Sequence, residues 1–297
     1  MRAAERGFLL LSSHLGDPAR KPLTPPQLRK LAIRMQGLER VEEERELNVW
    51  DLKHIGYTAD EAERILSLLA GEKQLREYLK HGEKYGCRPV TRVGESYPLL
   101  LRKRLGLDSP GCLWVKGDAA LLRQPAVSLV GSRDLREENR KFAQEVGRQA
   151  AIQGYVLVSG NARGADRTAQ ESCLEAGGKV ISVVADQLYR QPDRENMLYV
   201  SEDGYGEAFS TLRALSRNRV IHGLGIKTFV AQCSAEKGGT WSGTVKNLRS
   251  GWSDVYAFLD GSDGMLMLEQ LGANLIGMDD LKFFFDLQSR PKNLFDR

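Results

Sequence analysis

The chain has little cysteine: four residues among 297, with no Cys-x-x-Cys pair. Because Cys87, Cys112, Cys173 and Cys233 are far apart, neither a zinc site nor a disulfide framework is indicated. Histidine is equally scarce, with four residues and no His-x-x-x-His pair. We therefore predict buried thiols in a reducing compartment and no bound metal.

Long hydrophobic runs are also missing. The Phe-Leu-Leu-Leu run at residues 8–11 is too short for the core of a signal peptide, and it is followed by polar residues and Pro18. No segment of the sequence approaches the length of a membrane span. We therefore expect a cytoplasmic protein that has no membrane partner.

Neither sign of charge is in large excess. The 43 Lys and Arg residues outnumber the 39 Asp and Glu residues by four, and the pI is near 8.8. So small an excess helps binding to a polyanion only where the cations cluster locally. With 41% hydrophobic residues, the chain can bury a sizeable core in one large or two modest domains.

Two common phosphate-binding fingerprints are absent as well. The turn after residues 126–130 lacks Gly-x-Gly-x-x-Gly, which removes the main support for a redox role that uses a dinucleotide. The P-loop pattern Gly-x-x-x-x-Gly-Lys-Ser/Thr does not occur either. A phosphate site in this chain therefore needs a different cradle, and we predict no cofactor.

Two strand-to-helix turns offer such a cradle. A buried-strand pattern at 126–130 ends in Gly131, Ser132 and Arg133, and a second pattern at 155–158 leads into a turn that carries Ser159, Gly160, Arg163, Gly164 and Asp166. Parallel strands deliver turns of this kind to one edge of a sheet. There, small residues expose backbone N–H groups, and the arginines add charge-assisted hydrogen bonds. Taken singly, each turn is explained as well by a tight turn and an arginine that caps a helix.

A third polar cluster follows further along the chain. It combines guanidinium groups with short polar side chains, and a Gly-Gly-Thr-Trp-Ser-Gly run at 238–243 then opens another apparent helix. The candidate phosphate ligands in these two segments are Arg217, Asn218, Arg219, Ser242 and Gly243. We therefore expect several phosphate-binding turns to converge at one edge of the sheet.

The spacing of apolar residues predicts a helical N-terminal module followed by an α/β domain. Thr-x-x-Gln at 24–27 and Thr-x-x-Glu at 58–61 are capping boxes that precede apolar residues at helical spacing. Beyond residue 126, strands and helices alternate, which is typical of a Rossmann-like, doubly wound, mostly parallel sheet. The expected strands are 112–115, 126–130, 155–158, 179–184, 226–232 and 254–259, and the expected helices are one that ends before Gly154 and those at 165–176, 242–250 and 264–271.

In these motifs and their order, the chain resembles the DNA-processing protein A family, also called Smf, from about residue 97 to residue 276. The matching segments are Tyr-Pro at 97–98, Leu-Trp-Val-Lys-Gly-Asp at 113–118, Val-Gly-Ser-Arg at 130–133, Ser-Gly-x-Ala-Arg-Gly-x-Asp at 159–166, Ser-Arg-Asn-Arg at 216–219 and Ser-Gly-Thr at 242–244. We expect a helical module at 1–85, similar to the sterile-alpha-motif-like or helix-hairpin-helix-like extension of that family. A Rossmann-like DNA-processing domain at 95–285 and a tail at 286–297 complete the expected organisation.

The resemblance implies binding of single-stranded DNA through phosphate contacts. It further implies protection of that DNA, assistance in loading a RecA-type recombinase during DNA uptake or recombination, a homodimer, and no catalytic activity. The residues that match the phosphate turns of the family are Gly131, Ser132, Arg133, Ser159, Gly160, Arg163, Gly164, Arg217, Asn218 and Arg219. We expect Asp166 to tie down its loop or its arginines, since a carboxylate would repel phosphate.

Two other functions stay open at this point. Nucleotide phosphoribohydrolases of a related fold use a Pro-Gly-Gly-x-Gly-Thr turn and a nearby Glu, which residues 238–240 echo without the preceding Pro-Gly or the Glu. A sensor that binds a small nucleotide is the other alternative, because phosphate-binding turns alone suit it as well. Trp241 and Tyr189 are candidates for stacking on bases, although packing in the core or at its rim is the favoured explanation for any one aromatic.

Overall fold

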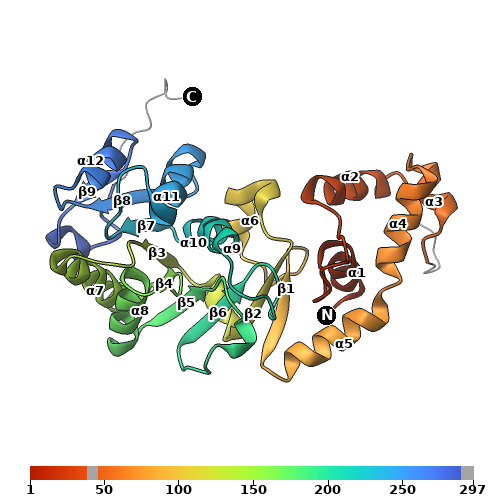
Figure 1. The fold of residues 1–297 in the computed structure, drawn as a ribbon, viewed down its shortest axis with the longest axis horizontal. Helices are drawn as coiled ribbons and strands as arrows, with labels where there is room; N and C mark the ends of the chain where they lie inside the picture. Colours follow the sequence, from red (N-terminus) through yellow and green to blue (C-terminus); the bar gives the residue numbers. More distant parts are fainter. Residues whose placement is uncertain (39–45, 289–297) are drawn as a thin grey trace.

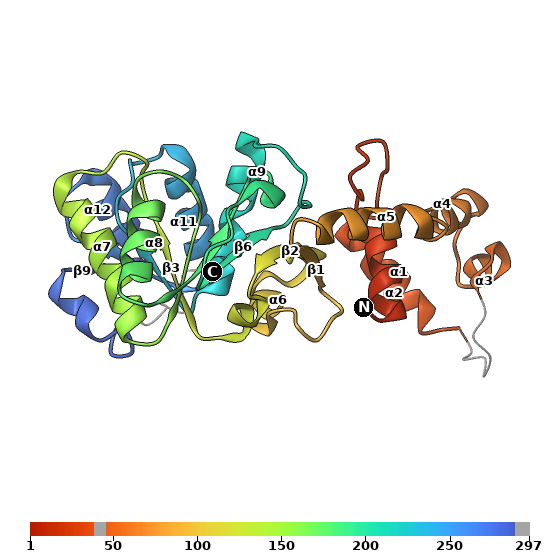
Figure 2. The ribbon, with the colours of Figure 1, turned by 90° about the horizontal axis from the view of Figure 1, so that it is seen from below.

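The structure, a computed structural model, describes residues 1–38 and 46–288. Helices form one end of an elongated molecule, and a sheet flanked by helices forms the other (Figures 1 and 2). Most of the predicted tail at 286–297 lies outside the described residues, because the description ends at residue 288.

The helical end is built from short helices that begin at capping residues. Its helices are α1 (Ala3–Ser12), α2 (Pro25–Met35), α3 (Val49–His54), α4 (Ala59–Leu69) and α5 (Glu72–Glu83). Both predicted capping boxes form: Thr24 pairs with Gln27 at the start of α2, and Thr58 pairs with Glu61 at the start of α4. A small cluster of buried apolar side chains, centred on the fully buried Leu52, packs between α2, α3 and α4.

Two of these helices also pack against the sheet. Leu9 and Leu10 of α1 and Leu75 of α5 belong to the same hydrophobic core as the strands, and all three are almost completely buried. The chain then enters the first strand only a few residues after α5 ends. The predicted division of the chain near residue 85 therefore stays a prediction, since the hydrophobic core extends across it.

Within the described residues, the sheet has nine strands in the order β1-β2-β6-β5-β4-β3-β7-β8-β9. The strands are β1 (Cys87–Thr91), β2 (Cys112–Gly117), β3 (Ala126–Val130), β4 (Val156–Ser159), β5 (Lys179–Val183), β6 (Met197–Ser201), β7 (Lys227–Val230), β8 (Asp254–Phe258) and β9 (Asn274–Ile276). β3 to β9 run parallel, while β2 pairs antiparallel with both β1 and β6. This arrangement confirms the predicted Rossmann-like, mostly parallel α/β fold.

The strand order reverses between β3 and β7. The chain builds β3, β4, β5 and β6 outward in one direction and then returns to place β7, β8 and β9 on the other side of β3. Connections leave such a switch point in opposite directions and open a crevice beyond the carboxyl ends of the strands. The topology therefore places a candidate site beyond β3 and β7.

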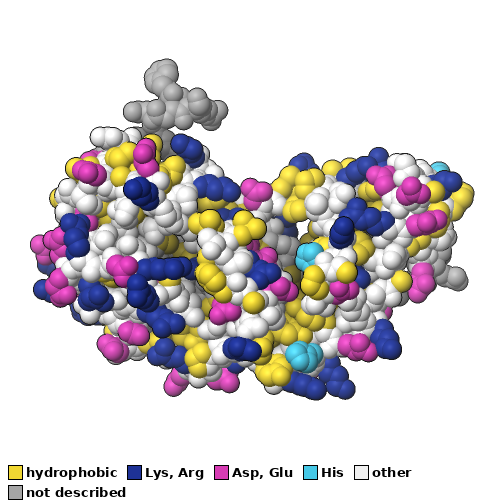
Figure 3. Space-filling view, in the orientation of Figure 1, with side chains coloured by type: hydrophobic (Ala, Val, Ile, Leu, Met, Phe, Trp, Pro, Cys, Tyr) yellow, Lys and Arg dark blue, Asp and Glu magenta, His cyan; other side chains and the backbone are white. Residues whose placement is uncertain are grey.

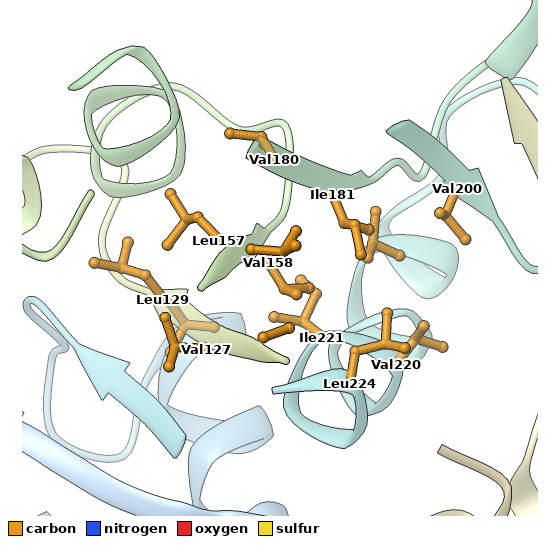
Figure 4. Close-up of a cluster of buried hydrophobic side chains, with 14 of the residues drawn as sticks. Val127, Leu129, Leu157, Val158, Val180, Ile181, Val200, Val220, Ile221 and Leu224 are labelled. Atoms are coloured by element: carbon orange, nitrogen blue, oxygen red, sulfur yellow. The ribbon is translucent and has the colours of Figure 1, made fainter. Parts of the chain in front are cut away.

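Helices cover both faces of the sheet. They are α6 (Leu99–Leu105), α7 (Glu137–Ile152), α8 (Ala165–Glu175), α9 (Thr211–Ser216), α10 (Asn218–Leu224), α11 (Gly238–Ser250) and α12 (Asp263–Gln270). All five residues of β3 are buried, as expected for a parallel strand covered on both faces. Figure 4 shows Val127, Leu157 and Ile181 of neighbouring strands with Ile221 of α10 in this core. No helix in the described residues is long and apolar enough to cross a membrane.

Some elements were not evident from the sequence. The sequence did not predict β1, β6, β9, α6, α9 and α10. α11 begins at Gly238, four residues before the predicted start at 242, although the glycines of its first turn have a low intrinsic helix propensity. Packing of a buried strand or helix overrides such local preferences.

A glycine at the contact between α7 and α8 gives a direct test of this packing. A Cβ at Gly147 would overlap the backbone carbonyl of Ala169, whereas a Cβ at Gly7 in α1 meets nothing within 4 Å. We expect Gly147→Ala to lower the free energy of unfolding by about 1–3 kcal/mol through overpacking, despite the better helix propensity of alanine. The matched Gly7→Ala change is expected to raise it by about 0.4–1 kcal/mol. Urea denaturation measures both, and stabilisation by Gly147→Ala would contradict the close approach of the two helices.

Candidate functional site

A pocket of about 400 Å³ opens beyond the carboxyl ends of β3 and β7. Gly131, Ser132 and Arg133, which directly follow β3, form part of its wall. Arg217 and Asn218, at the junction of α9 and α10, form another part. The segment that enters α11 contributes Lys237, Gly238, Gly239 and Thr240. The sheet thus brings five of the predicted phosphate ligands, together with Asp166, to its switch point.

Backbone hydrogen bonds tie the turns around this pocket to one another. The N–H of Ser132 donates to the carbonyl of Gln232 at 2.9 Å, and the carbonyl of Ser132 accepts from the N–H of Ala165 at 3.1 Å. Thr240 Oγ1 donates to the carbonyl of Gly131 at 2.9 Å. The turn after β3 is therefore hydrogen-bonded to three other segments: the start of α8, the segment after β7 and the first turn of α11.

Two glycines allow the turns after β3 and β4 to approach so closely. A Cβ at Gly131 would lie 2.5 Å from the Cβ of Ala165, and a Cβ at Gly164 would overlap the carbonyl of Arg133. Gly164 also has a φ of +81°, a conformation that other residues rarely adopt. Both predicted glycines therefore have a clear structural role at this contact.

Arg217 and Asp166 form a largely buried ion pair in the wall of the pocket. Arg217 Nη2 lies 3.9 Å from Asp166 Oδ2, and the two side chains are only 10% and 9% exposed. The same carboxylate oxygen accepts the N–H of Ala162 at 3.2 Å. Burial raises the pKa of Asp166 and lowers the pKa of Arg217, while their attraction shifts each pKa in the opposite direction. Asp166 therefore contacts both its own loop and an arginine, as its predicted role requires.

Gly160 lies directly against this ion pair. A Cβ at Gly160 would overlap the guanidinium group of Arg217 and the carboxylate of Asp166. Gly160 and Ser159 are both buried, and Ser159 Oγ accepts a hydrogen bond from Gln170 Nε2 at 2.7 Å. These two predicted phosphate ligands lie beneath the pocket rather than in its wall.

The predicted cations differ widely in their surroundings. Arg133 is exposed and has no hydrogen-bonding or ion-pair partner among the described residues. Arg163 pairs with Asp134 at 2.9 Å, but the two side chains are 71% and 83% exposed, so the pair is weak. Arg219 turns away from the pocket, because it pairs with Glu202 at 2.6 Å and donates to the carbonyl of Asp108 at 3.0 Å. Its guanidinium group is therefore engaged within the protein, and its phosphate contact stays a prediction.

The last predicted ligands also lie outside the pocket wall. Ser242 and Gly243 fall in the second turn of α11, and the pocket is lined instead by the residues at the start of that helix. Gly243 packs against Asn218, whose Nδ2 donates to the carbonyl of Gly239 at 3.0 Å. The earlier start of α11 places the free N–H groups of its first turn at residues 238–240, and phosphate binding by Ser242 and Gly243 stays a prediction.

A second pocket of about 400 Å³ adjoins the first. Both pockets share Arg133, Ala162, Phe209, Ala214 and Arg217. The second pocket adds Asn161, Arg163, Arg167, Val184, Ala185, Asp186 and Gln191. In Figure 3, Lys and Arg side chains are interspersed with Asp and Glu side chains over α7 and α8. The two pockets together form a recessed cationic surface along the sheet edge.

The sequence reasoning missed several lining residues, among them two exposed cations and one exposed aromatic side chain. Lys237 and Arg167 are exposed, line the first and second pocket respectively, and have no partner among the described residues. Both stand next to predicted motifs, so their position in the sequence could have indicated them. Phe209 is 54% exposed at the boundary of the two pockets, in a segment without a recognisable pattern.

The aromatics predicted to stack on bases are placed elsewhere. Trp241 is partly buried against the main core, and the ring of Tyr189 packs against Tyr85 with a centroid separation of 5.2 Å. Neither residue lines the two pockets. Packing explains both rings, and Phe209 is the aromatic side chain positioned to contact a ligand.

The pocket presents cations and helix N–H groups rather than a set of acid–base side chains. His222 lies at the pocket wall, but burial lowers its pKa to about 3, so it is neutral at physiological pH. Among residues 1–38 and 46–288, no group of three or more His, Cys, Asp or Glu side chains is placed to hold a metal ion. The site is therefore suited chemically to hold phosphate groups.

Comparison with known proteins agrees with this geometry. Residues 88–277 match the family described as DNA recombination-mediator protein A. The chain is similar to DNA processing protein DprA of Streptococcus pneumoniae strain ATCC BAA-255 / R6, with 34% identity over 198 residues that cover 60% of this chain and 68% of that protein.

Solved structures show the same relationship. The X-ray structure of DNA processing protein A from Streptococcus pneumoniae has a TM-score of 0.72 and 25% identity, covering 97% of this chain and 100% of the other. A Helicobacter pylori DNA processing protein A, described for its single-stranded DNA binding mode, has a TM-score of 0.54 and 22% identity over 66% of this chain and 92% of the other, which shows a shared fold. The resemblance seen in the sequence is confirmed: this chain belongs to the DNA recombination-mediator protein A family.

Proposed function

We propose that the protein binds single-stranded DNA in the two adjoining pockets at the carboxyl edge of its sheet. The observation that carries this proposal is Arg133, an exposed arginine without a partner in the described residues, placed where both pockets meet. An unpaired guanidinium group beside the first turn of a helix is well suited to a phosphate. Membership of a family of recombination mediators supports DNA as the source of that phosphate.

The proposal extends to the biological role. We infer that the protein, as a cytoplasmic homodimer, protects single-stranded DNA and assists the loading of a RecA-type recombinase during DNA uptake or recombination. The support for these steps is the family assignment and the likeness to a DNA processing protein of Streptococcus pneumoniae. A mediator acts by binding, so we assign the protein no catalytic step.

Single-stranded DNA should bind in preference to duplex, because a flexible backbone can enter recessed pockets that a rigid duplex cannot. We expect the logarithm of the binding constant to fall linearly with the logarithm of salt concentration, with a slope of about 0.7 per phosphate neutralised. Fluorescence anisotropy with a labelled oligothymidylate and a blunt duplex of equal length measures both effects. Equal affinity for the two DNAs, or binding that is independent of salt, would contradict the proposal.

The hydrolase and sensor alternatives give different results with mononucleotides. Asp166, an acidic side chain at the first pocket, faces Arg217 and its own loop. We therefore expect no release of free base when the protein is incubated with AMP, as followed by chromatography. Base release would establish the hydrolase. Saturable binding of AMP that is tighter than binding of an oligonucleotide would favour the sensor.

Substitution of two arginines separates DNA binding from stability. Arg133→Ala should weaken DNA binding and reduce the salt slope by about 0.7 without changing the melting temperature, because Arg133 is exposed. Arg217→Ala should lower the free energy of unfolding by about 3–5 kcal/mol, since it leaves the carboxylate of Asp166 buried without its partner.

The control is Arg123→Ala, at the end of a 3₁₀ turn (Ala119–Arg123) that precedes β3 and so lies at the opposite edge of the sheet. We expect Arg123→Ala to change neither the affinity for DNA nor the melting temperature. DNA titration and thermal melting are measured on the same preparations. Unchanged DNA affinity in a folded Arg133→Ala protein would remove the main support for the proposed site.

A further inference from the structure

The second pocket has a strong imbalance of charge. Its lining contains four arginines and a single acidic residue, Asp186. Two of these arginines belong to the boundary with the first pocket, but Arg163 and Arg167 belong to the second pocket alone. Arg217 pairs with Asp166 and Arg163 pairs with Asp134, so Arg133 and Arg167 are the cations of this lining that have no ion-pair partner among the described residues.

We propose that this pocket is a separate subsite for the adjacent nucleotide of the same strand, in which Arg167 binds the phosphate. The inference rests on the proposed function, because it assigns a position along the bound strand. Arg167 stands in the first turn of α8, immediately after the buried Asp166. It is exposed and has no partner in the part of the chain that the structure describes. Its guanidinium group is therefore available without the breaking of an existing ion pair.

Arg163 is the second cation of this subsite. Its ion pair with Asp134 is largely exposed and so contributes about 0–1 kcal/mol, which a phosphate can readily replace. Arg163 lies in the loop before α8, and this loop is anchored by the hydrogen bond from the N–H of Ala162 to Asp166. Arg167 lies in the first turn of α8. Both cations are thus carried by one well-anchored segment, which limits the entropy lost when they bind a ligand.

A strand can pass from one pocket to the other because they share a common wall. Arg217 in that wall is fixed by burial, whereas Arg133 is exposed and reaches both pockets. Phe209 completes the boundary, and its backbone N–H donates to Asp186 Oδ1 at 3.2 Å. At the boundary, a hydrogen bond holds the backbone of Phe209, and the ring of Phe209 is exposed. Arg133 adds a cation that has no ion-pair partner among the described residues.

The rest of the second pocket is suited to a nucleotide rather than to a bare anion. Asn161 Nδ2 donates to Gln191 Oε1 at 3.1 Å, so a pair of amide side chains lies in its wall. Gln191 is in turn held by its Nε2 bond to the carbonyl of Gln187 at 3.2 Å. Amide groups form hydrogen bonds with base edges, and a volume of about 400 Å³ falls in the range of pockets that hold small ligands.

Oligothymidylates of increasing length test this proposal on the full-length protein. Lys237 lines the first pocket only, and Arg167 lines the second only. On the shortest oligonucleotide that binds, we expect Lys237→Ala to weaken binding and Arg167→Ala to behave like wild type. On longer oligonucleotides both variants should weaken binding about tenfold at low salt, and Arg167→Ala should reduce the salt slope by about 0.7. Arg167→Lys, which retains the charge, should restore most of the affinity.

The controls separate this inference from the proposed function. Arg123→Ala should bind every oligonucleotide as the wild type does, and thermal melting confirms that each variant is folded. If wild type binds DNA but Arg167→Ala equals Arg123→Ala at all lengths, the second subsite is ruled out while the proposed function stands. If Arg167→Ala already weakens binding of the shortest oligonucleotide, the two pockets are not separate subsites. If wild type binds no single-stranded DNA, the proposed function itself fails.

Discussion

The arrangement of the site depends on the buried ion pair between Arg217 and Asp166. Arg217 comes from the junction of α9 and α10, and Asp166 from the first turn of α8, so their contact joins segments on two sides of the pocket. Gly160 lies against the same contact and leaves no room for a side chain. A buried ion pair adds little to the net free energy of unfolding, but loss of one partner leaves the other charge buried and uncompensated. The pair therefore fixes where the surrounding loops lie.

This constraint divides the arginines of the site into two groups. Arg219 pairs with Glu202, and the buried Arg217 pairs with Asp166 at 3.9 Å, although Nε and Nη1 of Arg217 have no hydrogen-bond partner among the described residues. Arg133 and Arg167 have no partner among the described residues and face the pockets. The division has a physical basis, because a buried guanidinium group must be paired, while an exposed one is stable in water until an anion arrives. Burial and partners, rather than motif membership, distinguish structural cations from those available for binding.

The sequence predicted the fold and the sheet edge at which the candidate site lies. The apolar runs that end in Gly131 and Gly160 identified buried parallel strands, and such strands place their turns at one sheet edge. It could not separate Arg133 from Arg219, because both stand beside glycine or polar residues in matching motifs. That difference arises from Glu202, which pairs with Arg219 only because the fold brings β6 beside α10. Ser242 and Gly243 were misplaced because the start of α11 is set by its packing and by the backbone of Gly238, whose φ is +82°.

Photo-cross-linking of a single-stranded oligonucleotide that carries 5-iododeoxyuridine tests the central claim most directly, because it locates the bound strand on the chain. Our account predicts cross-linked peptides that contain the pocket segments 130–134, 161–167, 209–218 and 233–240, with Phe209 as a favoured position. Arg133→Ala should reduce the yield at all four segments. Cross-links confined to the helical end, α1 to α5, or to the opposite edge of the sheet would contradict the account.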